Sequence, residues 1–394
     1  MNILFLMKVM HIGGQETVTI TLANKFASEG HKVSIVSFEK PWKEAINQID
    51  NSIQVYTLDG FKYSKKNVLQ LKDILSSEKI DIAINQWGLP YIPAMVLEAA
   101  IKKGNLKTKK IAIYHNDPET NARIMDVNIA LDFCKNPLMK FLLLLKKNII
   151  KKITCWSMRY VYKHSDQYQV LSPSYIEHFK KFTGIKSPKN LVVQANPTTI
   201  SSNNFSYNST NKNKEIIYCG RIDYNQKRVY RIIDVWSLLE AEFPEWKLTI
   251  IGDGESRSDI EKKVQALNLQ NVYFEGFQKP IDYYKRASIL VLTSEYEGFP
   301  LVIAESMSFG VIPCVYGSFS AVHDIIENDK NGIIVEKDEN GNFSAYKMAE
   351  SIKQIMNDER KRGDMARTAI ESSKNYSLDM IYGQWLNNIL NLNT

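Results

Sequence analysis

Short apolar runs alternate with segments of helical periodicity along almost the whole chain. Strands that alternate with helices form parallel sheets with covered faces. Such sheets bind their ligands at the carboxyl ends of the strands. The pattern therefore predicts an α/β fold. The expected strands are 2–7, 32–36, 53–58, 81–85, 111–114, 191–193, 216–218, 248–251, 272–274, 289–292, 311–315 and 332–335, and the expected helices are 15–29, 66–77, 229–239, 258–267, 301–309 and 379–390.

Two domains are expected, because 394 residues exceed what one ordinary core accommodates. Residues 201–214 are rich in Asn, Ser and Lys and poor in apolar side chains, which is typical of a linker. A second strand–helix series begins directly after this segment. We therefore expect domains at 1–200 and 201–375, followed by a terminal helical segment at 376–394.

The stretch from Glu297 to Glu305 carries the most informative chemistry. Glu297 lies in a Gly/Pro loop, and Glu305 is expected about 6 Å along the helix that follows. Pro300 suits the first helical position, and the free amides at a helix start bind phosphate. Two carboxylates around an anion site suit a nucleotide-diphosphate sugar. The alternative is a surface helix with two solvated carboxylates, but the apolar neighbours of Glu305 disfavour an unpartnered charge there.

Arg221 and Lys227 follow an expected strand and a glycine, which permits close backbone approach. A guanidinium grips phosphate oxygens in fixed geometry, and a lysine adds a mobile point charge. Two such cations can stabilise the charge of a departing nucleoside diphosphate without a metal. The alternative is a solvated basic turn.

The N-terminal half offers weaker signals at two strand ends. Gly13 and Gly14 follow the first strand and would let a ligand approach the backbone. His115 follows a later strand; alone, a histidine in this setting is more often structural than catalytic. These residues are candidates chiefly because their strand ends belong to the edge at which ligands gather.

These segments, in this order, resemble the retaining glycosyltransferases of the GT-B type, especially glycosyltransferase family 4 (glycosyl transferases group 1). The likeness is strong in the C-terminal half and weaker between about residues 40 and 190. It is carried by the glycine loop at 12–16, the Gly-Arg…Lys element at 218–227, the segments 250–254 and 271–277, and the Glu-x7-Glu motif at 297–305. The spacing from Arg221 to Lys227 is six positions, where many relatives show five.

The resemblance implies two facing Rossmann-like domains with a central cleft. The N-terminal domain would bind the acceptor, the C-terminal domain the nucleotide sugar, and the terminal helix would return to the N-terminal domain. Its implied catalytic residues are Arg221, Lys227, Glu297 and His115. Its implied donor-binding residues are Gly13, Gly14, Phe277, Gly298, Phe299, Pro300, Leu301 and Glu305. No cofactor and no metal are expected, and no residue is named as a covalent nucleophile.

Residues 135–163 contain eight cations, no acidic residue, and apolar side chains at helical spacing. A basic amphipathic helix of this kind fits an anionic membrane surface, with Lys146, Lys147, Lys151 and Lys152 as contacts. The alternative is a buried helix with one solvated basic face. The net charge of +7 suggests acidic partners without demanding nucleic acid, and none is expected.

The apolar N-terminal run is expected to be a strand rather than a signal peptide, and no run reaches a membrane span of roughly 18 residues. Four widely spaced cysteines suggest neither zinc nor disulfides. The expected protein is cytoplasmic, with peripheral contact at the inner face of the plasma membrane. It would transfer a hexose-type sugar, UDP-linked by default, to a lipid-linked glycan hydroxyl in bacterial surface polysaccharide biosynthesis. The alternatives are a GT-B sugar-nucleotide 2-epimerase, a non-catalytic GT-B partner protein and a nucleic-acid-binding protein.

Overall fold

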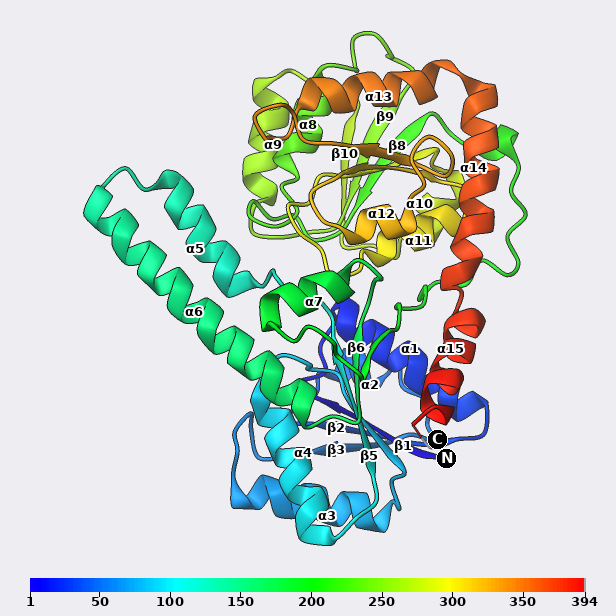
Figure 1. Cartoon of the computed structure of the whole chain (residues 1–394). Helices are drawn as coiled ribbons and strands as arrows, with labels where there is room; N and C mark the ends of the chain where they lie inside the picture. Colours follow the sequence, from blue (N-terminus) through cyan, green and yellow to red (C-terminus); the bar gives the residue numbers. More distant parts are fainter. Residues whose placement is uncertain (393–394) are drawn as a thin grey trace. The chain divides into compact units, whose positions relative to one another are not determined.

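The computed structural model describes residues 1–392, with the backbone alone at residues 122, 132 and 133. The chain divides into two compact units (Figure 1). Unit 1 comprises Met1–Thr199 and the C-terminal segment from Leu378, and unit 2 comprises Ile200–Ser377. The sequence predicts domain boundaries at 200/201 and 375/376, and the two compact units change at 199/200 and 377/378.

Unit 1 is built on a sheet that has seven strands among the described residues, in the order β3-β2-β1-β4-β5-β6-β7. All neighbouring strands pair in parallel. The strands are β1 (Asn2–Met7), β2 (Lys32–Ser37), β3 (Gln54–Thr57), β4 (Ile82–Asn85), β5 (Lys109–Tyr114), β6 (Gln167–Val170) and β7 (Leu191–Val193). The helices are α1 (Gly14–Ser28), α2 (Lys43–Ile46), α3 (Lys65–Ser77), α4 (Tyr91–Gly104), α5 (Ala122–Phe133), α6 (Pro137–Lys163), α7 (Tyr175–Thr183) and α15 (Leu378–Leu390).

Unit 2 has a parallel sheet of six strands among the described residues, in the order β10-β9-β8-β11-β12-β13. The strands are β8 (Glu215–Cys219), β9 (Lys247–Ile251), β10 (Val272–Gly276), β11 (Ile289–Leu292), β12 (Ile312–Tyr316) and β13 (Ile333–Val335). The helices are α8 (Tyr230–Ser237), α9 (Arg257–Ala266), α10 (Ile281–Arg286), α11 (Leu301–Ser308), α12 (Ala321–Ile325), α13 (Ala345–Asn357) and α14 (Glu359–Ser373). The predicted α/β class is confirmed.

The central strands are apolar because helices cover both faces of a parallel sheet. Five of the six residues of β1 are fully buried, as are all four of β11. Helix α15 packs on α1 within unit 1, where Trp385 and Tyr382 contact the ring of Phe26. A tail helix that buries aromatic side chains is thereby fixed to the first strand–helix pair of the chain.

Helix α6 projects from the sheet of unit 1 and packs along α5 (Figure 1). Pro137 occupies its first turn, and the Asn136 side chain accepts hydrogen bonds from the amides of Leu138 and Met139. Cap and proline together define a helix start. None of the helices among the described residues is both long and apolar enough to cross a bilayer.

Candidate functional site

The strand order of unit 2 reverses between β8 and β11. From this pair, β9 and β10 extend to one side and β12 and β13 to the other. A topological switch point of this kind leaves a crevice outside the carboxyl ends of its two central strands, and ligands bind there. The loop after β8 carries Arg221 and Lys227, and the loop after β11 carries Glu297. The fold thus brings the three side chains to one edge.

Lys227 and Glu297 form an ion pair, with 2.6 Å between Lys227 Nζ and Glu297 Oε1. Their side chains are only 17% and 7% exposed. Removing one partner of such a buried pair leaves an uncompensated charge, which costs far more than the loss of a surface pair. The pair therefore ties the two loops together while holding a cation at the switch point.

The guanidinium of Arg221 is largely exposed but is held by two acceptors. Its Nε donates to Asp223 Oδ2 at 2.9 Å, and its Nη2 donates to Gln226 Oε1 at 3.0 Å. Asp223 is buried and also accepts from the backbone amides of Gln226 and Lys227. One carboxylate therefore orders the loop and orients the guanidinium at the same time.

Gln226 joins this loop to the one after β11. Its carbonyl accepts from the amide of Glu295, and its side-chain amide donates to the carbonyl of Tyr296. Asp223 and Gln226 were not predicted as site residues. The sequence signal available was a polar side chain two positions and another five positions after Arg221. Polar side chains are also common in turns for structural reasons alone.

Helix α11 begins at Leu301, the first residue of the predicted range 301–309. Pro300 precedes the helix with ψ near 89°, outside the helical range, so the prediction that it is the first helical residue was wrong. The proline ring fixes φ only, and ψ is free to turn the chain into the helix. Glu305 lies one turn into α11 and is 5% exposed, while Phe299 is buried against Tyr376. Gly298 lies between Glu297 and Phe299 in the same loop.

The loops after β8, β9 and β10 are joined by backbone hydrogen bonds. The amide of Gly220 donates to Ile251, and the amide of Gly252 donates to Gly276. A Cβ at Gly252 would lie 1.9 Å from the carbonyl oxygen of Gly220, so only glycine permits this approach. Phe277 follows β10 with 74% of its surface exposed. The glycines position the loop of Arg221 and leave an aromatic ring uncovered beside them.

The strand order of unit 1 reverses in the same way, between β1 and β4. Gly13 and Gly14 lie where the loop after β1 enters α1: Gly13 is the N-cap residue and Gly14 is the first residue of that helix. His115 directly follows β5, the strand beside β4. Burial lowers the pKa of His115 to about 3, so the ring is neutral at physiological pH. A neutral imidazole with so low a pKa is a poor general base but a good hydrogen-bonding group.

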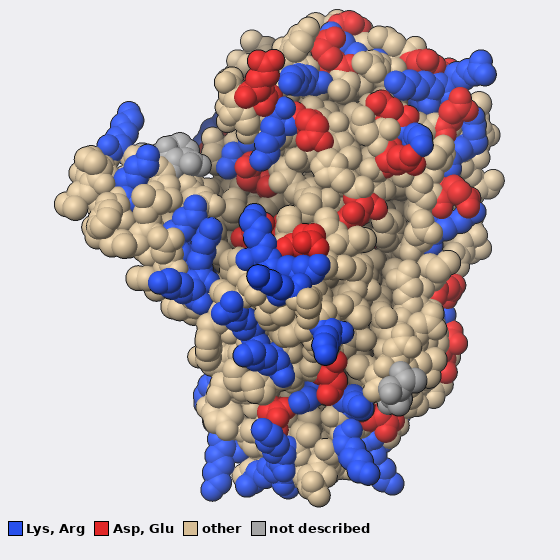
Figure 2. All heavy atoms as spheres, viewed as in Figure 1, with Lys and Arg blue, Asp and Glu red and all other residues tan. Residues whose placement is uncertain are grey.

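Helix α6 exposes an apolar stripe. Its members recur at spacings of three and four residues and are between 44% and 69% exposed: Leu138, Leu142, Leu145, Ile149, Ile153 and Trp156. Lys146, Lys151 and Lys152 are exposed, and Lys147 is half-buried. The predicted helix is present, and the alternative of a buried helix does not describe its outward face (Figure 2).

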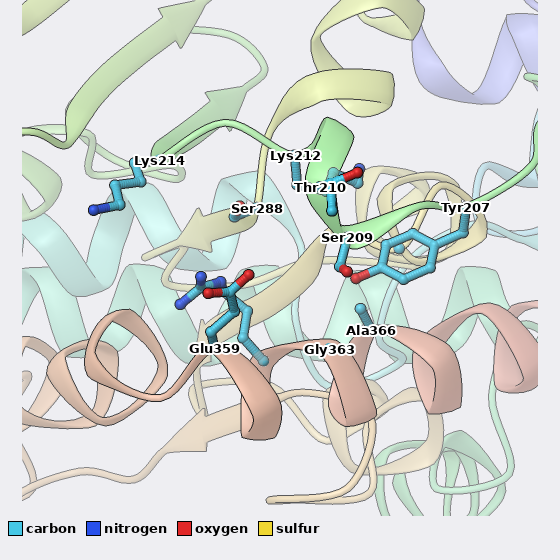
Figure 3. Close-up of a pocket in the computed structure, with 11 residues that line it drawn as sticks. Tyr207, Ser209, Thr210, Lys212, Lys214, Ser288, Glu359, Gly363 and Ala366 are labelled. Carbon is cyan, nitrogen blue, oxygen red and sulfur yellow. The ribbon is translucent and has the colours of Figure 1, made fainter.

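A separate cavity of about 140 Å³ lies at the opposite edge of the unit 2 sheet. Lys214 and Ser288, which line it, directly precede β8 and β11. Figure 3 shows the rest of its wall on the segment around Tyr207 and on α14. Lys212 lies there with its pKa lowered to about 7 by burial. This cavity contains none of the predicted site residues.

Unit 2 thus places two cationic side chains and a buried carboxylate at the switch point of a parallel α/β sheet, where folds of this kind bind their ligands. Two family models match the chain: "Glycosyltransferase Family 4" over residues 12–197 and "Glycosyl transferases group 1" over residues 200–372. Together they span nearly all of both units. The chain belongs to this family of GT-B-type glycosyltransferases.

Known relatives match over the full length. The chain is 24% identical to the Campylobacter jejuni protein named "GalNAc-alpha-(1->4)-GalNAc-alpha-(1->3)-diNAcBac-PP-undecaprenol alpha-1,4-N-acetyl-D-galactosaminyltransferase", covering 98% of this chain and 97% of that one. It is 23% identical to the amylovoran biosynthesis glycosyltransferase AmsD of Erwinia amylovora, with 97% of each covered. The crystal structure of Anabaena HepE in complex with UDP and glucose superposes with a TM-score of 0.73 at 15% identity, covering 99% of this chain and 100% of that one. The predicted GT-B fold is confirmed.

Proposed function

We propose that this glycosyltransferase transfers a hexose-type sugar from a nucleotide-diphosphate donor, with retention of anomeric configuration and without a metal. The observation that carries the proposal is the buried Lys227–Glu297 pair beside Arg221 at the switch point of unit 2. Departure of a nucleoside diphosphate builds charge on phosphate oxygens, and fixed cations stabilise it most effectively where water is excluded. UDP is the proposed nucleotide, supported by its presence in the HepE structure.

Each donor group has a proposed partner. Glu297 accepts from hydroxyls of the sugar, and Glu305 accepts from the ribose. The backbone from Gly298 to Leu301 meets the sugar or the diphosphate at the start of α11, where the N–H groups of a helix start and the helix dipole favour an anion. The backbone at Phe277 meets the base. Attack from the face that the leaving phosphate vacates gives retention without a covalent nucleophile.

The proposed acceptor is a hydroxyl of a lipid-linked glycan in bacterial surface polysaccharide biosynthesis. Support comes from the names of two relatives. The name of the first includes diNAcBac-PP-undecaprenol, and the name of the second includes amylovoran biosynthesis. An acceptor on a lipid anchor brings the enzyme to a membrane surface, and the proposed location is the inner face of the plasma membrane.

Helix α6 is the proposed membrane contact. Its apolar stripe is exposed, and its sequence contains seven cations and no acidic residue. Apolar area adds to electrostatic attraction when an amphipathic helix lies at an anionic interface, at about 1 kcal/mol per basic residue near the surface. We expect Lys→Gln at 146, 147, 151 and 152 together to abolish most binding to phosphatidylglycerol vesicles in a flotation assay.

The matched control for this helix changes four exposed lysines of unit 1 outside α6, namely Lys65, Lys103, Lys107 and Lys186. This control variant has the same net charge as the α6 variant. If both variants lose the same amount of vesicle binding, net charge alone explains the effect. Undiminished binding of the α6 variant would refute the membrane contact.

A thermal-shift panel of UDP, GDP, ADP and CMP, each with EDTA or with Mg²⁺, tests the donor site. A ligand that binds only the folded state raises the melting temperature by mass action. We expect one diphosphate to stabilise the wild type equally under both conditions, and the shift to vanish in Arg221→Ala. Arg367→Ala is the matched control, since Arg367 is similarly exposed in unit 2 and pairs with Asp364. No shift with any nucleotide would favour the non-catalytic partner.

The reaction products distinguish a glycosyltransferase from the alternative, a sugar-nucleotide 2-epimerase. A transferase bound to its donor releases UDP when an acceptor is added, whereas a 2-epimerase changes the sugar nucleotide with no acceptor present. The anomeric proton coupling of the new glycosidic bond in ¹H NMR then tests retention. An inverted bond would contradict the proposed mechanism while leaving transfer itself intact.

A further inference from the structure

Three neutral side chains are linked at the carboxyl edge of the unit 1 sheet. Gln86 directly follows β4, and His115 directly follows β5. The His115 Nε2 atom lies 2.7 Å from Gln86 Oε1. Gln15, at the start of α1, donates through its side-chain amide to the carbonyl of Gln86 at 2.8 Å. Gln86 thus connects the glycine turn after β1 with the histidine after β5.

The backbone holds Gln86 in this place. Its amide donates to the carbonyl of Leu6 on β1, and the Asn85 side chain accepts from the amide of Trp87. The next residue, Gly88, crosses the end of β5, where a Cβ would lie 2.5 Å from the carbonyl oxygen of Ile113. A glycine is required for the crossing, and the crossing places Gln86 beside His115. Gln86 is 1% exposed.

The contact with Gln86 decides the tautomer of His115. An amide oxygen can only accept, so His115 Nε2 must carry the proton that lies between them. The ring is neutral, because burial lowers the pKa of His115 to about 3. Its Nδ1 is therefore an unprotonated acceptor. Among the described residues, Nδ1 is buried without a hydrogen-bond partner, and so are Gln86 Nε2 and Trp87 Nε1.

Buried polar atoms without partners are uncommon in folded proteins. Three such atoms after the two neighbouring strands β4 and β5 therefore call for an explanation. One acceptor beside two donors matches the hydroxyl groups of a sugar, which both donate and accept. We propose that Gln86 is a positioning residue that locks His115 in the Nε2–H tautomer, so that Nδ1 accepts a hydrogen bond from a substrate hydroxyl. The assignment of that hydroxyl to a sugar rests on the proposed function.

The first test does not depend on activity. With ¹⁵N-labelled histidine, the six histidines of the chain give few signals, and His115→Asn identifies that of His115. We expect an Nε2–H pattern for His115 in the wild type and in Gln86→Glu, which keeps an acceptor oxygen. Gln86→Leu should give a mixed or Nδ1–H pattern. Gln169→Leu is the control, because Gln169 is a buried glutamine on β6 that bonds to Gln167. An unchanged tautomer in a folded Gln86→Leu would overturn the proposal.

The second test is a double-mutant cycle on release of UDP from UDP-glucose. Gln86→Leu should lower kcat/KM about tenfold, as expected for one lost hydrogen bond, and have little further effect in the His115→Asn background. Additive losses would show that Gln86 acts independently of His115 and would overturn the positioning role. If UDP-glucose is not turned over at all, glucose is excluded as the donor sugar, while the tautomer measurement still decides the role of Gln86.

Discussion

Both sheets have a switch point at the carboxyl ends of their strands, but different side-chain contacts connect the loops there. In unit 2 the strand ends are held by ion pairs, between Arg221 and Asp223 and between Lys227 and Glu297. In unit 1 the links at the switch point are neutral, from Gln15 to Gln86 and from Gln86 to His115. Ion pairs of that edge lie beside the switch point, between Lys8 and Glu39 and between Lys181 and Glu119. Both edges lie at a switch point in a parallel sheet. The sheet topology therefore gives each unit a candidate binding site, and the two candidate sites differ in the charge of their side chains.

Burial strengthens this contrast. The one acidic side chain in the first turn of α1, Glu16, is buried, and its pKa is raised chiefly by that burial. Burial likewise lowers the pKa of His115, so both groups of unit 1 shift toward their neutral forms. A diphosphate requires fixed cations, whereas sugar hydroxyls are recognised by neutral donors and acceptors. From this comparison we propose phosphate binding for unit 2 and hydroxyl recognition for unit 1.

The largest expected effect is at Lys227. Lys227→Met should lower turnover by about 10²–10³-fold, as for loss of one preorganised group that stabilises developing negative charge. It should also destabilise the fold, by up to about 3–5 kcal/mol, because the buried Glu297 carboxylate loses the cation of its ion pair. Turnover and urea unfolding measure the two effects separately.

Two further variants sharpen this result. Lys227→Met combined with Glu297→Met should regain part of the stability without regaining turnover, because the buried carboxylate is removed together with its cation. Lys214→Met is the control, since its pair with Glu245 is exposed and worth under about 1 kcal/mol. Turnover near the wild-type value in the single Lys227 variant would remove the cation from the mechanism.

Glu305 comes next. Glu305→Ala should weaken UDP binding about 10–100-fold, as expected for hydrogen bonds to a charged acceptor. Isothermal titration calorimetry measures the affinity, and Glu305→Gln, which keeps one acceptor oxygen, should lie between the two. Glu371→Ala on α14 tests for a general effect of removing a carboxylate. Unchanged affinity in Glu305→Ala would rule out its ribose role.

A smaller effect is expected at Asp223. Asp223→Asn keeps an acceptor for the loop amides but loses the ionic contact with Arg221. We expect kcat to fall about tenfold, equivalent to 1.4 kcal/mol, because the guanidinium is no longer fixed. Asp364→Asn breaks an Arg–Asp pair away from the site, with both side chains exposed, and should leave kcat unchanged. An unaffected kcat in Asp223→Asn would show that Arg221 needs no fixed partner.

The sequence predicted the charged edge better than the neutral one. The resemblance to the family grouped Arg221, Lys227 and Glu297 in one site, and the fold agrees because each follows a strand and such ends share one edge. It missed Asp223, Gln226 and Gln86, since an Asp or Gln near a turn usually serves the turn itself. The role of Gln86 depends on Gly88 crossing β5, which is a tertiary contact. Pro300 was misplaced because φ alone does not decide where a helix begins.

The neutral edge makes one prediction about pH. Unfolded histidine titrates near 6.5, whereas the pKa of folded His115 is about 3. Between these values the unfolded chain binds one more proton, so stability falls as pH falls, by up to about 1.4 kcal/mol per pH unit. Urea unfolding between pH 7 and 5 should show a shallower loss in His115→Asn than in the wild type. His323→Asn, which changes an exposed histidine of unit 2, is the control. Equal slopes in wild type and His115→Asn would mean that the folded protein does not hold this ring neutral, and the contrast between the two edges would fail at its central residue.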